Sequence, residues 1–304
     1  MSYDIPIGRN ESDKKKFGKR GLAYIGKTYV KMGQYTSLSN KLYMDISRSH
    51  VILLAGKRGS GKSYTLGVLT EELANLPESE GQNIASIIFD TMGIYWTMKF
   101  RNDKDKELLS DWGLKSQSLP VKVFVPFGYY DKFSEKGVPI DHKFALDVSQ
   151  LNPEDWILTF NLEIMHPVAT LIQRTLTRIK NERKDFIIKD IIEEIEKDKK
   201  SSIETVNAAA GLFEAAETWG IFSKYHDEST KINDLINAGT TSVLDLSMYN
   251  SVGAFNIRAL VISLLSRKIF NERMEARKAE EIQAISKGIN YGSSTEKKQV
   301  PLVW

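Results

Sequence analysis

The pattern of apolar and polar residues predicts an α/β protein in which most strands are buried. Continuous apolar runs of strand length are typical of parallel sheets, and they occur at residues 51–55, 84–90, 121–125 and 240–246, with a weaker run at 144–148. Two further segments alternate between apolar and polar residues around a Gly and Ser-Asn turn. These segments, 23–32 and 41–46, predict a β-hairpin.

Helical periodicity dominates two other parts of the chain. Between Trp156 and Trp219 apolar residues recur every three or four positions. Asn152-Pro153-Glu154-Asp155 in front of them is a strong helix start, because Asn caps the first turn, Pro fits it and acids favour its dipole. A long amphipathic helix is predicted from about Gly253 to Glu281, followed by a polar loop at 282–299 and another apolar strand at 300–304.

Composition limits the classes of protein that fit this chain. Its 304 residues contain 41% hydrophobic and 27% charged residues, which suits a globular protein with a sizeable core. The net charge of +3 argues only weakly for an anionic partner. The absence of cysteine excludes disulfides and thiolate metal sites. No apolar run approaches a membrane span, and no secretory signal is evident, so we expect a soluble cytoplasmic protein with no membrane contact.

The chemistry is concentrated in the segment after the first apolar run. Gly56-Lys57-Arg58-Gly59-Ser60-Gly61-Lys62-Ser63 fits G-x-x-x-x-G-K-[ST] at every fixed position, with a strand pattern before it and a helix pattern after it. Glycines let successive N–H groups point at phosphate oxygens, and the helix adds its positive end. We therefore predict an ATP site, with Lys62 on the β- and γ-phosphates and Ser63 on Mg²⁺. A plain glycine-rich turn is the alternative. The predicted nucleotide-binding residues are Gly56, Lys57, Arg58, Gly59, Ser60, Gly61, Lys62, Ser63 and Tyr64.

A carboxylate ends the second predicted strand, Ile84 to Asp90. Strand, helix and strand at this spacing indicate a βαβ unit, and ligands bind beyond the carboxyl ends of such strands. Asp90 is therefore expected near the phosphates. It could be the acid that holds Mg²⁺ through water, a second-strand carboxylate with that acid later in the chain, or a structural residue that caps the turn.

Four segments in this order resemble the HerA/FtsK-type branch of P-loop ATPases, over about residues 22–304. The first is Arg58 to Ser63, and the second is the Asp-x-x-Gly-x-Tyr pattern of Asp90, Gly93 and Tyr95. The third is Val243-Leu244-Asp245-Leu246-Ser247 followed by a long helix, and Val300 to Trp304 resembles the opening of the Walker B strand. The resemblance favours the second interpretation of Asp90 and implies a catalytic role for Asp90 near the γ-phosphate or the attacking water, beside Lys62.

The resemblance also implies a fold class and a division of the chain. The expected fold is a RecA-like P-loop core with a mainly parallel sheet, a helical insertion and a short N-terminal β-hairpin. The expected parts are a basic flexible arm (1–22), a hairpin remnant (23–48), the first part of the ATPase core (49–150), the helical insertion (151–238) and a continued, truncated core (239–304). The lysines and arginine at positions 14–20 are expected to be solvated or to contact phosphate.

The implied activity is that of a DNA translocase or helicase motor in DNA end processing or defence. Such motors are homo-oligomers, in this case a hexamer, that bind ATP and Mg²⁺ between subunits and pass double-stranded DNA, often with a NurA-like nuclease. Ile94 stands where HerA usually carries Glu. The Walker B acid and a partner arginine are expected after Trp304, so we expect the 304-residue chain alone to be deficient in hydrolysis. A non-hydrolysing nucleotide-gated scaffold and a small-molecule kinase remain alternatives.

Overall fold

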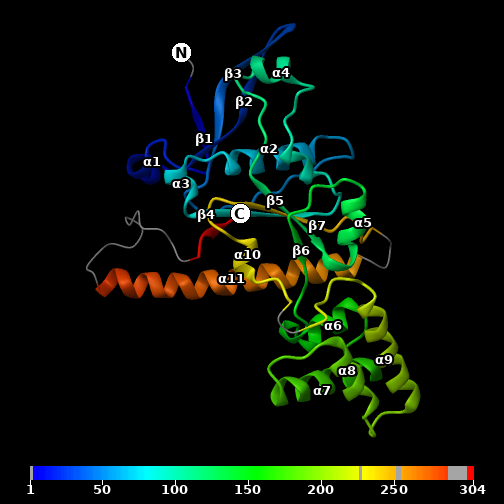
Figure 1. Ribbon diagram of the computed structural model, residues 1–304. Coiled ribbons are helices and arrows are strands. Elements are labelled where there is room, and N and C mark those ends of the chain that lie inside the picture. Colours follow the sequence, from blue (N-terminus) through cyan, green and yellow to red (C-terminus); the bar gives the residue numbers. More distant parts are fainter. Residues whose placement is uncertain (1–2, 226–227, 251–254, 287–299) are drawn as a thin grey trace.

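The computed structural model describes residues 3–225, 228–250, 255–286 and 300–304. It contains two β-sheets and a separate group of helices (Figure 1). The larger sheet consists of β4 (Ile84–Asp90), β5 (Val121–Pro126), β6 (His142–Phe144), β7 (Thr241–Asp245) and β8 (Leu302–Val303). These five strands are all parallel and follow the order β6-β5-β7-β4-β8. The predicted fold class, a mainly parallel α/β core, is confirmed.

Helices cover both faces of this sheet. Helix α2 (Lys62–Ala74) lies on one face and the long helix α11 (Phe255–Ser286) on the other (Figure 1). Buried side chains of α11, such as Val261 and Leu264, join the same core as Leu244 of β7. Among the described helices, none is long and apolar enough to cross a lipid bilayer.

Four helices between β6 and β7 form the predicted helical insertion, at the far end of the molecule from the N-terminus (Figure 1). They are α6 (Pro153–Thr159), α7 (Pro167–Glu182), α8 (Ile188–Glu196) and α9 (Ile203–Glu217). Trp156 is fully buried and packs on Phe213 and Phe222, with ring centroids 4.8 and 5.1 Å away. Asp155 in α6 accepts two hydrogen bonds from Arg267 of α11, at 2.7 and 3.0 Å, which ties this unit to the core.

Short helices complete the described chain. They are α1 (Glu11–Phe17), α3 (Glu78–Gly81), α4 (Lys106–Asp111), α5 (Tyr130–Glu135) and α10 (Ile232–Leu235), with 3₁₀ turns at Tyr95–Lys99, Phe127–Tyr129 and Val148–Gln150.

The N-terminal sheet contains the predicted hairpin. Its strands are β1 (Ile5–Ile7), β2 (Leu22–Met32) and β3 (Tyr35–Asp45), in the order β1-β3-β2, with β2 and β3 antiparallel. Ala23, Met44 and Ile46 at its base pack against Leu69 and Leu73, so α2 lies between the two sheets. Strand β1 and helix α1 fall in the stretch for which composition predicts a flexible arm.

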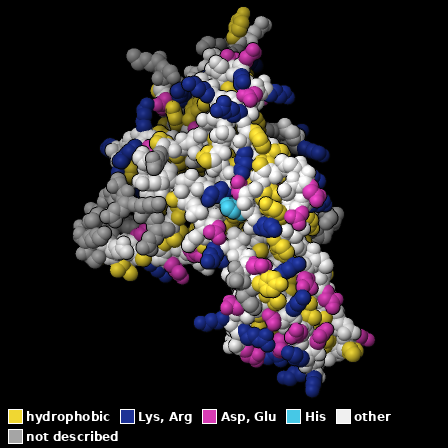
Figure 2. All heavy atoms as spheres, in the orientation of Figure 1, with side chains coloured by type: hydrophobic (Ala, Val, Ile, Leu, Met, Phe, Trp, Pro, Cys, Tyr) yellow, Lys and Arg dark blue, Asp and Glu magenta, His cyan; other side chains and the backbone are white. Residues whose placement is uncertain are grey.

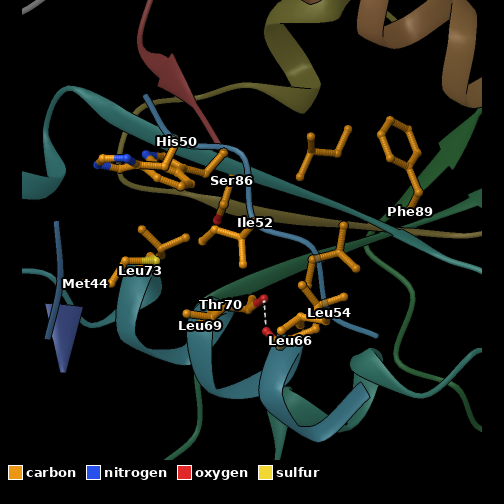
Figure 3. A pocket seen from close by; sticks show the side chains of 13 residues that line it. Met44, His50, Ile52, Leu54, Leu66, Leu69, Thr70, Leu73, Ser86 and Phe89 are labelled. Atoms are coloured by element: carbon orange, nitrogen blue, oxygen red, sulfur yellow. Dashed lines mark hydrogen bonds between the residues drawn. The ribbon is translucent and has the colours of Figure 1, made fainter. Parts of the chain in front are cut away.

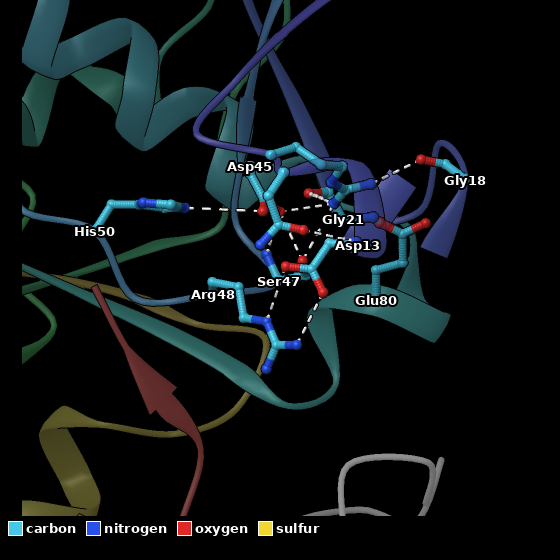
Figure 4. A network of polar contacts seen from close by, with 10 residues as sticks. Asp13, Gly18, Gly21, Asp45, Ser47, Arg48, His50 and Glu80 are labelled. Carbon is cyan, nitrogen blue, oxygen red and sulfur yellow. Dashed lines mark hydrogen bonds and ion pairs between the residues drawn. The ribbon is translucent and has the colours of Figure 1, made fainter. Parts of the chain in front are cut away.

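An N-terminal polar network of Arg9, Asp13, Asp45, Ser47, Arg48 and His50 explains why that stretch is ordered (Figure 4). Arg9 donates to Asp45 at 2.6 Å, and both side chains are fully buried. Arg9 also donates to the carbonyls of Gly18 and Gly21, at 2.8 and 2.9 Å. Arg48 forms two hydrogen bonds to Asp13 of α1. The network therefore fastens the N-terminal stretch to residues 45–50, which lead into the glycine-rich loop.

The predicted strand at 51–55 is not formed. This segment has no strand partner, and Val51 and Leu53 are 102% and 88% exposed. Strand β8 forms the nearby edge of the sheet and pairs with β4. A cavity of about 400 Å³ consequently lies between α2 and β4, lined by Ile52, Leu54, Leu66, Leu69, Leu73 and Trp304 among others (Figure 3).

Near the C-terminus the predicted elements shift by a few residues. The long helix runs to Ser286, beyond the expected end at Glu281. The remainder of the predicted loop, residues 287–299, lies outside the described residues. The predicted terminal strand is present as β8, which pairs with β4 through Leu302 and Val303.

Glu72 of α2 makes the contact with the N-terminal sheet sensitive to pH. Burial, with the neighbouring Glu71 adding to it, raises the pKa of Glu72 to about 7. The folded protein therefore keeps a proton that the unfolded chain releases. Its stabilising contribution is complete below pH 4.5 and is lost as the pH rises through about 7.

We expect Glu72→Gln to remove this pH dependence. Relative to the Gln variant, the wild-type protein should lose about 1 kcal/mol of unfolding free energy between pH 5 and pH 8, after discounting for the partial exposure of the carboxyl. Urea unfolding at several pH values measures the difference. Glu107→Gln on exposed α4 is the matched control, and equal pH slopes in all three proteins would contradict the assignment.

Candidate functional site

The glycine-rich loop of residues 56–63 leads directly into α2. Gly59 and Gly61 adopt positive φ angles of +80° and +86°, which residues with a Cβ rarely adopt, and Gly61 caps the helix. A Cβ on Gly56 would collide with the hydroxyl of Ser60. The sequence thus places glycine where the backbone must curl, and α2 presents its N-terminal amides to the loop.

The ammonium of Lys62 lies within the loop. It donates to the carbonyls of Gly56 and Lys57, at 2.8 and 2.7 Å. A cation in this position, beside the unpaired amides of a helix start, suits the oxygens of a polyphosphate. The Lys62 ammonium, the loop backbone and the start of α2 therefore lie together.

The other predicted nucleotide-binding residues surround this loop. Ser63 is the second residue of α2, and its side chain is exposed. Lys57 and Arg58 are exposed on the loop itself, and Tyr64 is 73% exposed beside it. Among the described residues, no group of three or more acidic or histidine side chains could hold a metal ion. A magnesium ion at Ser63 would take part of its coordination from oxygens of the nucleotide, as magnesium commonly does.

Asp90 lies at the carboxyl end of β4 and is 1% exposed. One carboxylate oxygen accepts hydrogen bonds from the N–H groups of Met92 and Gly93, at 3.0 and 2.8 Å. The other accepts from Ile94 and Tyr95, at 2.7 and 2.8 Å. These contacts match the alternative in which Asp90 caps the turn. Its predicted catalytic role stays a prediction.

The turn after Asp90 reaches the start of α2. The hydroxyl of Tyr95 donates to the backbone carbonyl of Ser63 at 2.9 Å, and the ring lies beside Gly67. Burial raises the pKa of Tyr95, and the nearby Asp90 carboxylate adds to the rise, so the hydroxyl remains a donor at neutral pH. The structure thus connects two motifs that are 32 residues apart in the sequence.

Asp245 is a second buried acid at this edge, and the sequence identified it only as part of a strand motif. It ends β7 directly beside Asp90 in the sheet register. One of its oxygens accepts the N–H of Ser247 at 2.8 Å, whereas the other is buried without a hydrogen bond from any described residue. Burial raises the pKa of Asp245, and Asp90 adds to the rise. The signal in the sequence that could have indicated this pair is that Asp90 and Asp245 each end a separate apolar run.

A parallel sheet flanked by helices, with a lysine-bearing glycine loop at a helix start, defines a P-loop NTPase. A family model described as helicase HerA, central domain, matches residues 25–269. The chain belongs to this family of HerA/FtsK-type P-loop ATPases, and its general activity is that of an ATPase motor. A search of curated proteins finds no match to the chain.

Proposed function

We propose that this chain is the ATP-binding subunit of a DNA translocase or helicase that moves double-stranded DNA. The observation that carries the proposal is the loop at 56–63, where the Lys62 ammonium lies between two loop carbonyls at the start of α2. Membership of the HerA family supports a motor that couples nucleotide use to DNA. A hexameric ring, with a NurA-like nuclease as a possible partner, is the assembly that the resemblance implies.

The residues of the loop divide the work of holding a nucleotide. Amides of the loop and of the first turn of α2 donate to the phosphates, and Lys62 leaves the carbonyls of Gly56 and Lys57 to bridge the terminal phosphates. The Ser63 hydroxyl would be the protein ligand for Mg²⁺, which would neutralise phosphate charge. Lys57 and Arg58 are exposed. We assign them to contacts with a neighbouring subunit or with its bound nucleotide.

The charge distribution suggests where DNA makes contact. Residues 14–44 contain eight Lys or Arg and no Asp or Glu, although the whole chain carries a net charge of only +3. Lys and Arg side chains are prominent over the part of the molecule where the N-terminal sheet lies (Figure 2). A surface of this kind attracts the phosphate backbone of nucleic acids.

A pair of lysines within the hairpin strengthens this argument. Lys27 and Lys41 lie directly opposite each other on β2 and β3, and no described ion pair involves either of them. Like charges placed opposite each other destabilise a sheet, and a phosphate between them would relieve the repulsion. Tyr29 and Tyr35, nearer the turn of the hairpin, are 66% and 82% exposed. A two-stranded ribbon of this kind fits the major groove of a duplex.

A test of the motor function is steady-state ATP hydrolysis by the complete protein, measured with and without duplex DNA. We expect DNA to stimulate turnover, and we expect Lys62→Ala to abolish it. ATP-dependent oligomers without any response to DNA would instead favour a scaffold. Release of ADP that requires a small-molecule acceptor, and not DNA, would favour a kinase.

A test of the DNA surface is the triple variant Lys27→Ala, Lys31→Ala and Lys41→Ala. Each lost phosphate contact should lower the slope of log affinity against log salt by about 0.9, and affinity for duplex DNA should fall at least tenfold. The matched control removes the same charge from the helical insertion, at the exposed lysines Lys189, Lys199 and Lys200. Equal salt slopes for the two triple variants would show that DNA binds elsewhere.

A further inference from the structure

The turn between β4 and the 3₁₀ segment Tyr95–Lys99 is held by an unusually complete set of hydrogen bonds to one carboxylate. All four hydrogen-bonding positions of the Asp90 carboxylate are occupied by successive backbone N–H groups of residues 92–95. A carboxylate that accepts four amide hydrogen bonds has little capacity left for a metal, water or phosphate. Its chemistry is that of a rigid anchor for the backbone that follows it.

A glycine locks the other side of this turn. Gly93 has a φ of +68°, and a Cβ there would lie 2.9 Å from the Cβ of Ser247, which follows β7. The backbone of the turn therefore lies against two adjacent strand ends, those of β4 and β7. Ile94 follows Gly93, and its side chain is 39% exposed, whereas its backbone N–H is bonded to Asp90. The turn is therefore held through its backbone and not through the side chain of Ile94.

The hydrogen bonds of the turn fix the position of Tyr95, whose N–H donates to Asp90. Its side chain is 8% exposed and crosses to α2, where its hydroxyl donates to the carbonyl of Ser63. Ser63 is the predicted magnesium ligand. The hydrogen bond therefore fixes the backbone of the one residue whose side chain must point at the metal. Functional side chains need placement within about 0.5 Å and 10–20°.

We propose that Asp90 and Tyr95 are positioning residues that hold Ser63 in the orientation required for magnesium, and that Asp90 does not act on the phosphate directly. This inference rests on the proposed ATP site and deepens it. The chain of contacts runs from the edge of the sheet, through the turn, to the first turn of α2. It transmits any shift of β4 or β7 to the metal ligand.

The direct test is Tyr95→Phe, which keeps the packed ring and removes only the donor. Binding of a fluorescent ATP analogue is measured over a range of Mg²⁺ concentrations and in EDTA. We expect the Mg²⁺ midpoint to rise about five- to tenfold, the effect of one hydrogen bond, with affinity in EDTA unchanged. An unchanged midpoint, or an equal loss of affinity with and without Mg²⁺, would overturn the proposal.

Tyr249→Phe is the matched control, because Tyr249 is also buried and donates to a backbone carbonyl, that of Trp219, at 2.8 Å. It should lose some stability but keep the wild-type Mg²⁺ midpoint. Failure of the proposed function looks different. In that case the wild-type protein would not bind the analogue at all, or Lys62→Ala would bind it equally well.

A second measurement uses the unmodified protein and does not depend on the folding of a variant. Amide hydrogen exchange is followed with Mg²⁺ and the ATP analogue, and with the analogue in EDTA. We expect added protection at residues 92–95 only when Mg²⁺ is present, together with protection of the loop at 56–63. Protection of the loop without any change at residues 92–95 would argue against the mechanical connection.

Discussion

Lys62→Ala is expected to weaken ATP binding by at least about a hundredfold. The Lys62 ammonium lies inside the loop, where it would contact at least two phosphates. A charge-assisted contact to phosphate contributes about 1.5–3 kcal/mol. In the absence of nucleotide the lysine only satisfies two loop carbonyls, which water can also do because the loop is exposed. The fold should therefore survive the substitution.

Isothermal calorimetry with ATP and Mg²⁺ measures this effect. Lys189→Ala on α8 removes the same charge from an exposed site remote from the loop and should bind ATP as the wild type does. Circular dichroism spectra should agree for all three proteins. If Lys62→Ala and the wild type bound ATP with the same affinity, the nucleotide would have to lie elsewhere on the protein.

The second large effect concerns stability. Arg9→Leu should lower the free energy of unfolding by about 3–5 kcal/mol, because it leaves Asp45 charged and buried without its main partner. Burial by itself would raise the pKa of Asp45, but hydrogen bonds from Arg9 and Ser47 outweigh it and hold this pKa below its usual value. Loss of Arg9 removes the largest of the contributions that lower this pKa and leaves burial opposed only by Ser47.

Urea unfolding provides the measurement. Lys19→Leu is the control, since Lys19 forms an ion pair of the same 2.6 Å length with Asp4. Its side chain is 85% exposed, so water screens the pair and its loss should cost far less stability than the loss of Arg9. Adding Asp45→Asn to Arg9→Leu should restore part of the lost stability, because the stranded charge disappears. Equal stability of Arg9→Leu and Lys19→Leu would contradict the assigned role of the network.

Local patterns in the sequence were sufficient for the loop and for most of the core. The spacing of Gly56, Gly61 and Lys62 is set by the curled backbone, and apolar runs marked β4, β5 and β7 because those strands are buried on both faces. The helix start at Asn152 was also predicted, and the backbone N–H of Asn152 donates to the Asp155 carboxylate at 2.8 Å.

Features that depend on distant partners were not predictable in this way. Arg9 is surrounded by polar residues in the sequence and looks solvated, yet its partner Asp45 lies 36 residues away and buries it. The run at 51–55 is as apolar as a buried strand but pairs with nothing, because pairing depends on the neighbouring edge. For Asp90, the sequence indicated the right end of the sheet but not the four amides that occupy its oxygens.

The attachment of Arg9 and Asp13 to residues 45–50 has a practical consequence for anyone who prepares this protein. The first twenty residues resemble a dispensable tail that is commonly trimmed for crystallisation or replaced by a purification tag. Shortening the chain there would remove Arg9 and free the backbone that leads into the glycine-rich loop. A preparation trimmed in this way would be unstable and bind nucleotide poorly for reasons unrelated to its catalytic residues.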